Sequence, residues 1–200
     1  MRIGYFGGTF DPPHRAHLRV AQQAAEAFSL DRVLLAPTGL QPLKKTPPEA
    51  GFADRVMMTR LLCGGDSRLE ATELDAPHED GSPNYTVDAL TTLQAEHSGA
   101  QIFALAGADS FLTLRQWREP DRLLELAEWI VVSRPESPLE DLSALHLTPA
   151  HHSRVHLLQG LEDEASASEI RARLHAGVSC GTALPPAVLL YVARMHLYQR

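Results

Sequence analysis

The sequence predicts an α/β fold in which a doubly wound, mostly parallel sheet carries helices on both faces. The first observation is that short runs of apolar and β-branched residues alternate with helical patterns along the chain. The second is that most of these runs consist mainly of apolar and β-branched residues, as expected for strands that are buried on both faces. In such a sheet ligands bind beyond the carboxyl ends of the strands. Candidate functional residues should therefore lie in the loops that follow the strands.

Six strands are expected, at Arg2–Phe6, Val33–Ala36, Arg68–Leu74, Ile102–Ala106, Trp129–Val132 and Val155–Leu158. Helices are expected at His14–Phe28, Phe52–Leu62, Tyr85–Glu96, Asp121–Leu126, Ser168–Ala176 and Pro186–Tyr198. This alternation is that of a Rossmann-like fold. Residues 1–200 are expected to form one domain, with a small helical C-terminal part from about residue 165 to 200. Residues 134–153, rich in Pro, Ser and His, are expected to form a surface excursion.

Length and composition limit what the protein does. The formal net charge of -7 argues against a nucleic-acid binder, because phosphate backbones select basic surfaces. The longest later apolar run, residues 187–193, is far shorter than the roughly 20 residues that span a membrane. No signal peptide is expected, and two cysteines that lie far apart in sequence suit a reducing cytoplasm. The sequence leaves open whether the chain forms a homo-oligomer.

The loop after the first strand carries the strongest chemical signal. Gly7 and Gly8 follow the strand directly, and glycines there allow positive φ and a close approach by phosphate. Asp11 and two prolines make a rigid turn. A helix then begins near His14, and His17 stands three residues later on the same face. Two imidazoles beside the free amides of a helix start indicate a site for a polyanion.

This segment resembles the signature of the adenylyltransferases that share a His-x-Gly-His motif, and most closely that of nicotinate mononucleotide adenylyltransferases. That family has Gly-Gly-Thr-Phe-Asp-Pro-x-His-x-Gly-His, and this chain departs from it at Ala16, where the family has glycine. The resemblance implies that His14 and His17 contact the phosphates of ATP and stabilise the transition state at the α-phosphate. It also assigns phosphate binding to four loop residues: Gly7, Gly8, Thr9 and Phe10.

A segment near the other end of the chain adds hydroxyl groups and a cation. Ser168 is expected to cap the helix that follows, and Arg171 stands in its first turn. Judged by itself, this segment is better explained as an ordinary capped helix with a surface arginine. The segment resembles the family's Ile-Ser-x-Thr-x-Ile-Arg element, with Ala165 in place of isoleucine and Ser168 in place of threonine. The resemblance implies that Ser166, Ser168 and Arg171 bind the β- and γ-phosphates.

The loop after the second strand carries Lys44 and Lys45. It is similar to the family's Pro-Pro-His-Lys loop, with Leu43 in place of the histidine. The resemblance implies a catalytic role for Lys44, whereas Lys45 is equally well explained as a solvated side chain. In the next helix Arg55 matches a recurrent Arg-x-x-Met pattern, and an arginine there is more often a structural ion-pair partner than a ligand.

Four residues are candidates for binding the second substrate. Residues 84–90, Asn-Tyr-Thr-Val-Asp-Ala-Leu, resemble the family's Ser-Tyr-Thr-Val-Asp-Thr-Leu, which implies that the turn at Thr86 receives the nicotinate carboxyl group. Gly107 and Asp109 follow a strand, where a small residue allows close approach and a carboxylate can bind a ribose hydroxyl. Trp117 matches the aromatic residue that the family stacks on the pyridine ring, although a half-buried structural tryptophan also fits.

The resemblance implies transfer of AMP from ATP to nicotinate mononucleotide in NAD biosynthesis, with Mg²⁺ bound to ATP and no metal site of the protein's own. Two other functions stay open: an enzyme of the same superfamily that acts on phosphopantetheine, and a module that binds nucleotide without turnover. A dehydrogenase is disfavoured because the first loop lacks the Gly-x-Gly-x-x-Gly fingerprint. The preference between nicotinate and nicotinamide mononucleotide depends on hydrogen-bond donors that the sequence does not place.

Overall fold

The computed structural model describes residues 1–44, 46–133, 142–159 and 166–199. Within these residues the strands are β1 (Arg2–Gly8), β2 (Arg32–Pro37), β3 (Leu69–Ala71), β4 (Gln101–Gly107), β5 (Glu128–Val132) and β6 (Val155–Leu158). They form one sheet in the order β3-β2-β1-β4-β5-β6. Every pair of neighbouring strands is parallel, so the sheet is wholly rather than mostly parallel. The predicted α/β class is confirmed.

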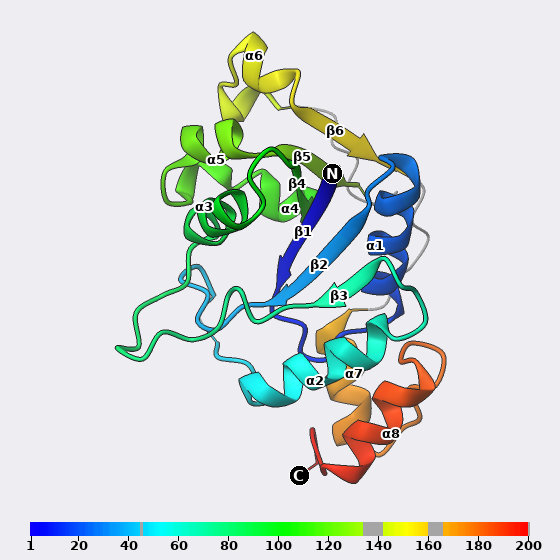
Figure 1. The fold of residues 1–200 in the computed structure, drawn as a ribbon. Helices are drawn as coiled ribbons and strands as arrows, with labels where there is room; N and C mark the ends of the chain where they lie inside the picture. The colour runs from blue at the N-terminus through cyan, green and yellow to red at the C-terminus, as the bar shows by residue number, and fades with distance from the viewer. Residues whose placement is uncertain (45, 134–141, 160–165, 200) are drawn as a thin grey trace.

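Helices cover both faces of the sheet (Figure 1). They are α1 (Arg15–Ala27), α2 (Phe52–Cys63), α3 (Thr86–Glu96), α4 (Ala108–Phe111), α5 (Pro120–Leu126), α6 (Pro149–His152), α7 (Ala167–His175) and α8 (Pro186–Arg194). Two single 3₁₀ turns lie at Leu114–Gln116 and Ser143–Leu145. Figure 1 shows α1 on one side of the sheet and α3, α4 and α5 on the other, with α2, α7 and α8 together near the C-terminus. No helix among the described residues is long and apolar enough to cross a membrane.

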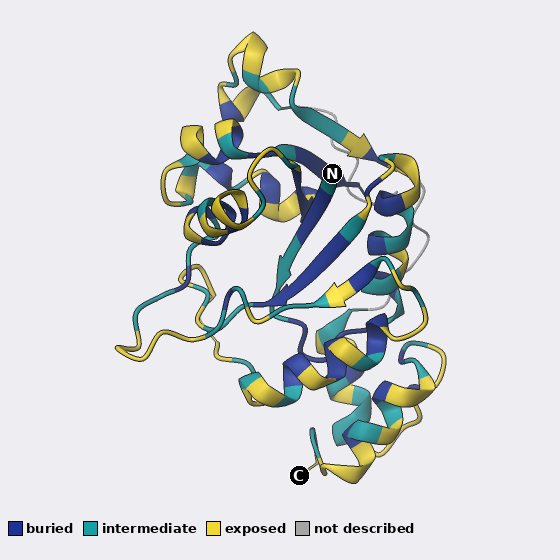
Figure 2. Ribbon diagram, viewed as in Figure 1, coloured by how far each residue is buried: buried dark blue, intermediate teal, exposed yellow. Residues whose placement is uncertain are grey.

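Alternate residues of each central strand pack on opposite faces of the sheet. In β2, Val33 and Leu35 join buried side chains of α1, α2 and α8, whereas Leu34 and Ala36 join those of α3 and α5. The period of two follows from the pleat of a strand, and burial on both faces explains why the runs predicted for the central strands show no alternation of polar and apolar residues. Figure 2 shows this dark, buried sheet between the partly exposed helices.

The strand order reverses next to β1. The chain moves from β1 to β2 and β3 on one side, and then crosses to β4, β5 and β6 on the other. The loops after Gly8 and Gly107 therefore leave adjacent strand ends in opposite directions, which opens a crevice between them. This is the place where a doubly wound sheet binds its ligand.

The C-terminal helix is shorter than expected. It was predicted to reach Tyr198 but ends at Arg194, because the next residues form a Schellman motif with His196 at φ 54°. The N–H of Leu197 donates to the carbonyl of Val192 at 3.0 Å, as that motif requires. The chain thus reverses and returns Tyr198 to the protein interior, where it is 6% exposed.

Three other elements differ from the prediction. The strand expected at Arg68–Leu74 forms only at Leu69–Ala71, because this edge strand pairs on one side alone and the chain then turns at Thr72. The short helix α4 was not expected. Of the predicted excursion at residues 134–153, residues 142–153 contain a 3₁₀ turn and α6, and residues 134–141 lie outside the described part.

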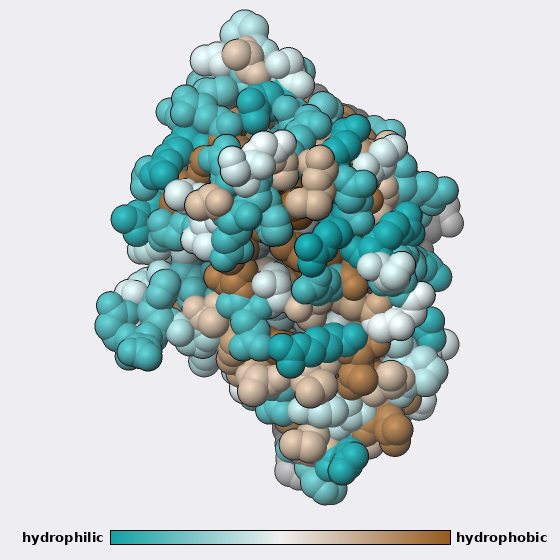
Figure 3. All heavy atoms as spheres, viewed as in Figure 1, coloured by the Kyte–Doolittle hydropathy of each residue, from teal (hydrophilic) through white to brown (hydrophobic). Residues whose placement is uncertain are grey.

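Most of the surface seen in Figure 3 is hydrophilic. Apolar surface appears at the lower right, where α8 lies in Figure 1. Leu190 of α8 and Met195 beyond its end are 71% and 47% exposed.

Candidate active site

A cleft of about 580 Å³ lies at the carboxyl ends of β1, β2 and β4, where the strand order reverses. Most of the residues that the sequence marked as candidates line this one cleft: Gly7, Gly8, Thr9, His14, His17, Lys44, Thr86, Gly107, Asp109, Trp117 and Ser166. Phe10, Ser168 and Arg171 are not among the residues that line it. The tertiary structure therefore brings together residues from both halves of the chain.

The two glycines of the first loop act through their size and not through their backbone conformation. The expectation of positive φ is wrong for them, because both belong to β1 and the left-handed residue is Phe10, at φ 50°. A Cβ atom on Gly7 would lie 2.8 Å from the hydroxyl of Tyr5, and one on Gly8 would lie 3.2 Å from the ring of Phe10. Phe10 is 2% exposed and packs edge-on against His17, so it supports the cleft from beneath.

The two histidines form a stacked pair at the start of α1. His14 is the N-cap residue, and its ring centroid lies 3.9 Å from that of His17. The backbone N–H of His14 donates to Nδ1 of His17 at 3.2 Å. Because Nδ1 accepts a hydrogen bond, the proton of a neutral His17 ring is on Nε2. His17 can therefore donate an N–H to an anion in the cleft, beside the amides of the helix start.

Asp11 joins three parts of the chain, a role that the sequence analysis missed. Its carboxylate is 3% exposed and accepts hydrogen bonds from the backbone N–H groups of Glu49 and Ala50 at 2.8 and 3.1 Å. A third bond comes from the hydroxyl of Tyr198 at 2.7 Å. Asp11 thus links the first loop to the residues that enter α2 and to the end of the chain. No sequence pattern signals these partners, because they lie 38 to 187 residues away.

Arg55 in α2 fastens the loops after β1 and β2 to each other. Its guanidinium is buried and donates to the carbonyl oxygens of Thr9 at 2.7 Å, Thr38 at 2.9 Å and Ala50 at 3.3 Å. The structural role expected for this arginine is confirmed, although its hydrogen-bond partners are backbone carbonyls. A planar fork with several donors suits this task, since each carbonyl lies in a different segment.

Lys44 places a positive charge at the mouth of the cleft. Its ammonium donates to Oγ1 of Thr9 at 2.6 Å. Partial burial of the ammonium lowers the pKa of Lys44, and the charge of Arg171 lowers it further. The charges of Arg171, Asp11 and Arg55 all act on the pKa of Lys44, which places two further cations and one buried carboxylate near its ammonium. Lys45 lies outside the described residues.

The segment with Arg171 lies against the first loop. The helix cap is Ser166 and not the expected Ser168, since Oγ of Ser166 accepts the backbone N–H three residues later at 3.2 Å. Arg171 donates to the carbonyl of Asp11 at 2.7 Å and to the carboxylate of Glu49 at 2.9 Å. Oγ of Ser168 lies 3.4 Å from the same guanidinium. The cation is therefore held beside the loop by groups on both sides.

The opposite wall of the cleft contains the other candidates. Thr86 is the first residue of α3, and Gly107 ends β4 with no atom within 4 Å of the position of a Cβ atom. Asp109 is exposed in the short helix α4. Trp117 is half-buried, and its indole N–H donates to Oγ1 of Thr113 at 3.1 Å. A fixed aromatic ring next to open space above a glycine can hold a flat heterocycle.

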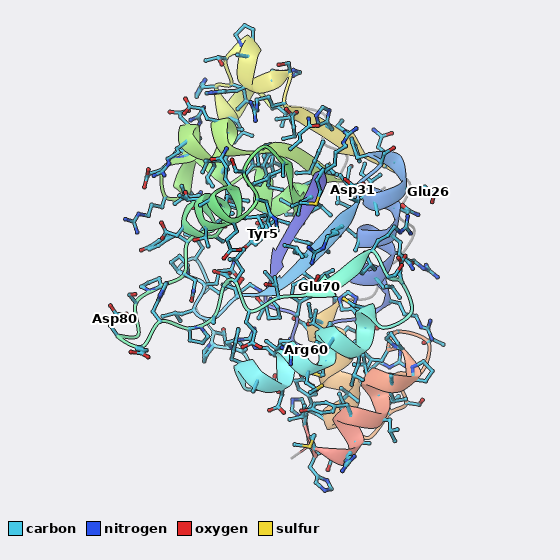
Figure 4. The ribbon with its side chains drawn as sticks, viewed as in Figure 1. Tyr5, Glu26, Asp31, Arg60, Glu70 and Asp80 are labelled. Atoms are coloured by element: carbon cyan, nitrogen blue, oxygen red, sulfur yellow. The ribbon has the colours of Figure 1, made fainter. Side chains whose placement is uncertain are left out.

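Buried polar groups at the floor of the cleft were not anticipated. Asp75 is 5% exposed, and burial raises its pKa to about 6. Asn84 joins two loops, since its Oδ1 accepts from the N–H of Leu40 at 2.8 Å and its Nδ2 donates to the carbonyl of Ala76 at 2.7 Å. Tyr5 belongs to β1 and also lines the cleft, and its side chain is buried on the face of the sheet that α3 covers (Figure 4). Asp75 and Asn84 lie in loops with no regular pattern, so local sequence carries no signal for their burial.

A doubly wound sheet with a polyanion loop at its strand-order reversal defines a nucleotide-binding protein of the transferase type. Comparison with known proteins agrees with this, because the family model described as cytidylyltransferase-like matches residues 5–173. The chain belongs to this family and, within it, to the nicotinate-nucleotide adenylyltransferases. The resemblance inferred from the sequence motifs is confirmed.

Full-length relatives support this membership. A protein of Solibacter usitatus named "Probable nicotinate-nucleotide adenylyltransferase" is 38% identical, covering 99% of this chain and 100% of its own. A protein of the same name from Pelobacter propionicus is 36% identical, covering 99% and 98%. The solved structure of Plasmodium falciparum nicotinic acid mononucleotide adenylyltransferase complexed with NaAD shares the fold, with a TM-score of 0.79 at 19% identity over 98% of this chain and 97% of that one.

Proposed function

We propose that this protein transfers AMP from ATP to nicotinate mononucleotide, which forms deamido-NAD and pyrophosphate in NAD biosynthesis. The observation that carries the proposal is the division of one cleft into two walls. One wall has the stacked histidines, Lys44 and the start of α1, and it suits a triphosphate. The other has Trp117 and the open surface of Gly107, and it suits a pyridine mononucleotide. The relatives carry the name of this activity.

The proposed reaction is an in-line displacement at the α-phosphorus of ATP. A 5′-phosphate oxygen of the mononucleotide forms the new bond to phosphorus, and the bond to the bridging oxygen breaks, so that pyrophosphate leaves with its electron pair. Such transfers require positioning and charge stabilisation more than covalent help from the protein. The N–H at Nε2 of His17, the ring of His14 and the ammonium of Lys44 supply donors for the oxygens around the α-phosphorus.

Phosphate binding is assigned to the first loop and the start of α7. We propose that the backbone at Gly7, Gly8, Thr9 and Phe10 and the groups of Ser166, Ser168 and Arg171 hold the triphosphate. Arg171 is already oriented by the carbonyl of Asp11, which lies in this loop. Glycine at positions 7 and 8 lets the side chains of Tyr5 and Phe10 pack closely beside the loop, because a Cβ atom there would lie 2.8 Å from Tyr5 and 3.2 Å from Phe10.

The mononucleotide is assigned to the second wall. We propose that Trp117 stacks on the pyridine ring, that Asp109 binds a ribose hydroxyl, and that Gly107 lets the sugar approach the backbone. The amides at Thr86, the start of α3, would receive the carboxyl group of the ring.

Mg²⁺ is proposed to enter with ATP, held by phosphate oxygens and water. Mg²⁺ is usually bound through substrate phosphates and water rather than by a cage of protein ligands. The reaction is proposed for the cytoplasm, where thiols such as those of Cys63 and Cys180 stay reduced.

The test is pyrophosphate release from ATP and Mg²⁺ with three acceptors in parallel: nicotinate mononucleotide, nicotinamide mononucleotide and phosphopantetheine. We expect the highest kcat/KM with nicotinate mononucleotide. Faster turnover of phosphopantetheine would contradict the proposed acceptor. Binding of ATP by calorimetry without pyrophosphate release in any arm would show a nucleotide-binding module without this activity.

A further inference from the structure

The acceptor wall contains a cation that no motif of the sequence marked. Arg118 directly follows Trp117 and lines the same cleft. Its guanidinium carbon lies 4.7 Å from the centroid of the Tyr85 ring, so the cation is stacked over that ring. Such stacking holds a planar guanidinium flat while leaving its N–H edge available for a further partner.

The stacking on Tyr85 places the cation of Arg118 close to the N-terminus of α3. Tyr85 is the N-cap residue of α3, and Thr86 follows it as the first residue of an 11-residue helix. The stacked guanidinium therefore lies near the helix N-terminus, where free N–H groups and the helix dipole already favour an anion. A full positive charge and the partial charge of the helix start thus lie near each other in the lining of the cleft.

Two carboxylates lie near Arg118 without satisfying it. Asp88 is 3.8 Å and Glu119 is 3.7 Å from its nitrogens, both longer than a hydrogen bond. The side chains are 54% and 42% exposed, so water and salt weaken these two attractions. The side chain of Arg118 is itself 51% exposed and lines the cleft, so an anion that enters the cleft can reach its N–H groups.

We propose that Arg118 is a specificity-determining residue: its side chain makes the cleft prefer a mononucleotide whose ring carries a carboxylate over one whose ring carries a neutral amide. This rests on the proposed function, because it assumes that a pyridine mononucleotide occupies the wall of Trp117. A charge-assisted contact of this kind changes affinity by about tenfold. A ring with a neutral amide can still stack on Trp117 but gains little from the positive charge. The charge of Arg118 therefore changes the ratio of the affinities for the two ligands.

Product binding tests this inference without depending on turnover. Calorimetry would measure Kd for deamido-NAD and for NAD, which differ only in the acid or amide on the ring. The variants are Arg118→Gln, which removes the charge, and Arg118→Lys, which keeps the charge without the planar fork. Arg122→Gln is the matched control, because Arg122 is an exposed arginine on the same segment that pairs with Glu119 and does not line the cleft.

We expect the wild type and Arg122→Gln to bind deamido-NAD more tightly than NAD. In Arg118→Gln the Kd for deamido-NAD should rise about tenfold while that for NAD stays nearly constant, and Arg118→Lys should recover part of the preference. An unchanged ratio of the two Kd values in Arg118→Gln, or no preference in the wild type, would overturn the inference. Failure of the wild type to release pyrophosphate would instead count against the proposed function, and the Kd ratio would still decide the role of Arg118.

Discussion

The hydroxyl of Tyr198 donates a 2.7 Å hydrogen bond to Oδ1 of Asp11 across 187 residues of sequence. This bond fastens the end of the chain to the first loop of the candidate active site. It forms only because the Schellman turn after α8 sends the chain back toward the sheet. Burial raises the pKa of Tyr198, and the hydrogen bond to Asp11 raises it further. The hydroxyl therefore keeps its proton and remains a donor at physiological pH.

Tyr198→Phe should destabilise the protein by about 1–3 kcal/mol, because a buried carboxylate loses one of its donors. The free energy of unfolding in urea measures this effect. Tyr191→Phe is the control, since the hydroxyl of Tyr191 also donates to a carboxylate, that of Asp54, but is only partly buried. Its loss should cost less than about 1 kcal/mol. Equal losses in the two variants would contradict the role given to the bond with Asp11.

His14→Ala and His17→Ala should each lower kcat by about 10²-fold or more, because each removes a donor that stabilises charge in the transition state. Steady-state pyrophosphate release at saturating ATP and nicotinate mononucleotide measures this change. Circular dichroism should show an intact fold. His152→Ala, in the exposed helix α6 outside the cleft, is the matched control and should keep wild-type kcat. Near-normal turnover of both active-site variants would refute the role proposed for the histidine pair.

Gly107→Ala should weaken binding of the mononucleotide without changing the stability of the fold. The backbone at Gly107 has φ -67° and ψ 150°, and no atom lies within 4 Å of the new Cβ, so stability should stay within about 1 kcal/mol of the wild type. If the mononucleotide lies over this backbone, the methyl group should raise its KM about tenfold. Gly65→Ala, which also has open space around it but does not line the cleft, should leave KM unchanged. A normal KM in Gly107→Ala would place the acceptor elsewhere.

Asp75 should make the stability of the ligand-free protein depend on pH. Burial raises its pKa to about 6 from an ordinary value of 3.8, so the folded protein binds this proton more tightly than the unfolded chain does. The stabilisation is therefore complete below about pH 4 and is lost as the pH rises through 6. Asp75→Asn cannot ionise, so its stability relative to the wild type should rise by about 1 kcal/mol between pH 5 and pH 7.5.

Urea unfolding of the wild type and Asp75→Asn at both pH values measures this difference. Asp80→Asn is the control, because Asp80 lies on the exposed loop that projects from the molecule (Figure 4). It should show no comparable rise. A constant difference between Asp75→Asn and the wild type at the two pH values would mean that Asp75 is already ionised at pH 5 in the folded protein.

The sequence alone determined the fold class and most of the candidate site. Buried strands show as short apolar runs, and the start of α1 shows as glycines, a proline turn and a histidine pair, because each of these signals lies within a few neighbouring residues. The first loop and Trp117, which are about 100 residues apart, were both marked in this way and line one cleft. Knowledge that ligands bind at the carboxyl ends of parallel strands was enough to expect their meeting.

Only the tertiary structure decided how these parts are held together. Arg55 donates to three backbone carbonyls, and a carbonyl is the same group in every residue, so no side-chain pattern announces it. Asp11 and Tyr198 pair because a helix ends four residues earlier than its apolar pattern suggested. The same holds for the cation of Arg118 over Tyr85, which meet across a loop and a helix start. Contacts between distant segments depend on where the whole chain packs, and that is settled by the total burial and hydrogen bonding of the fold and not by neighbours in sequence.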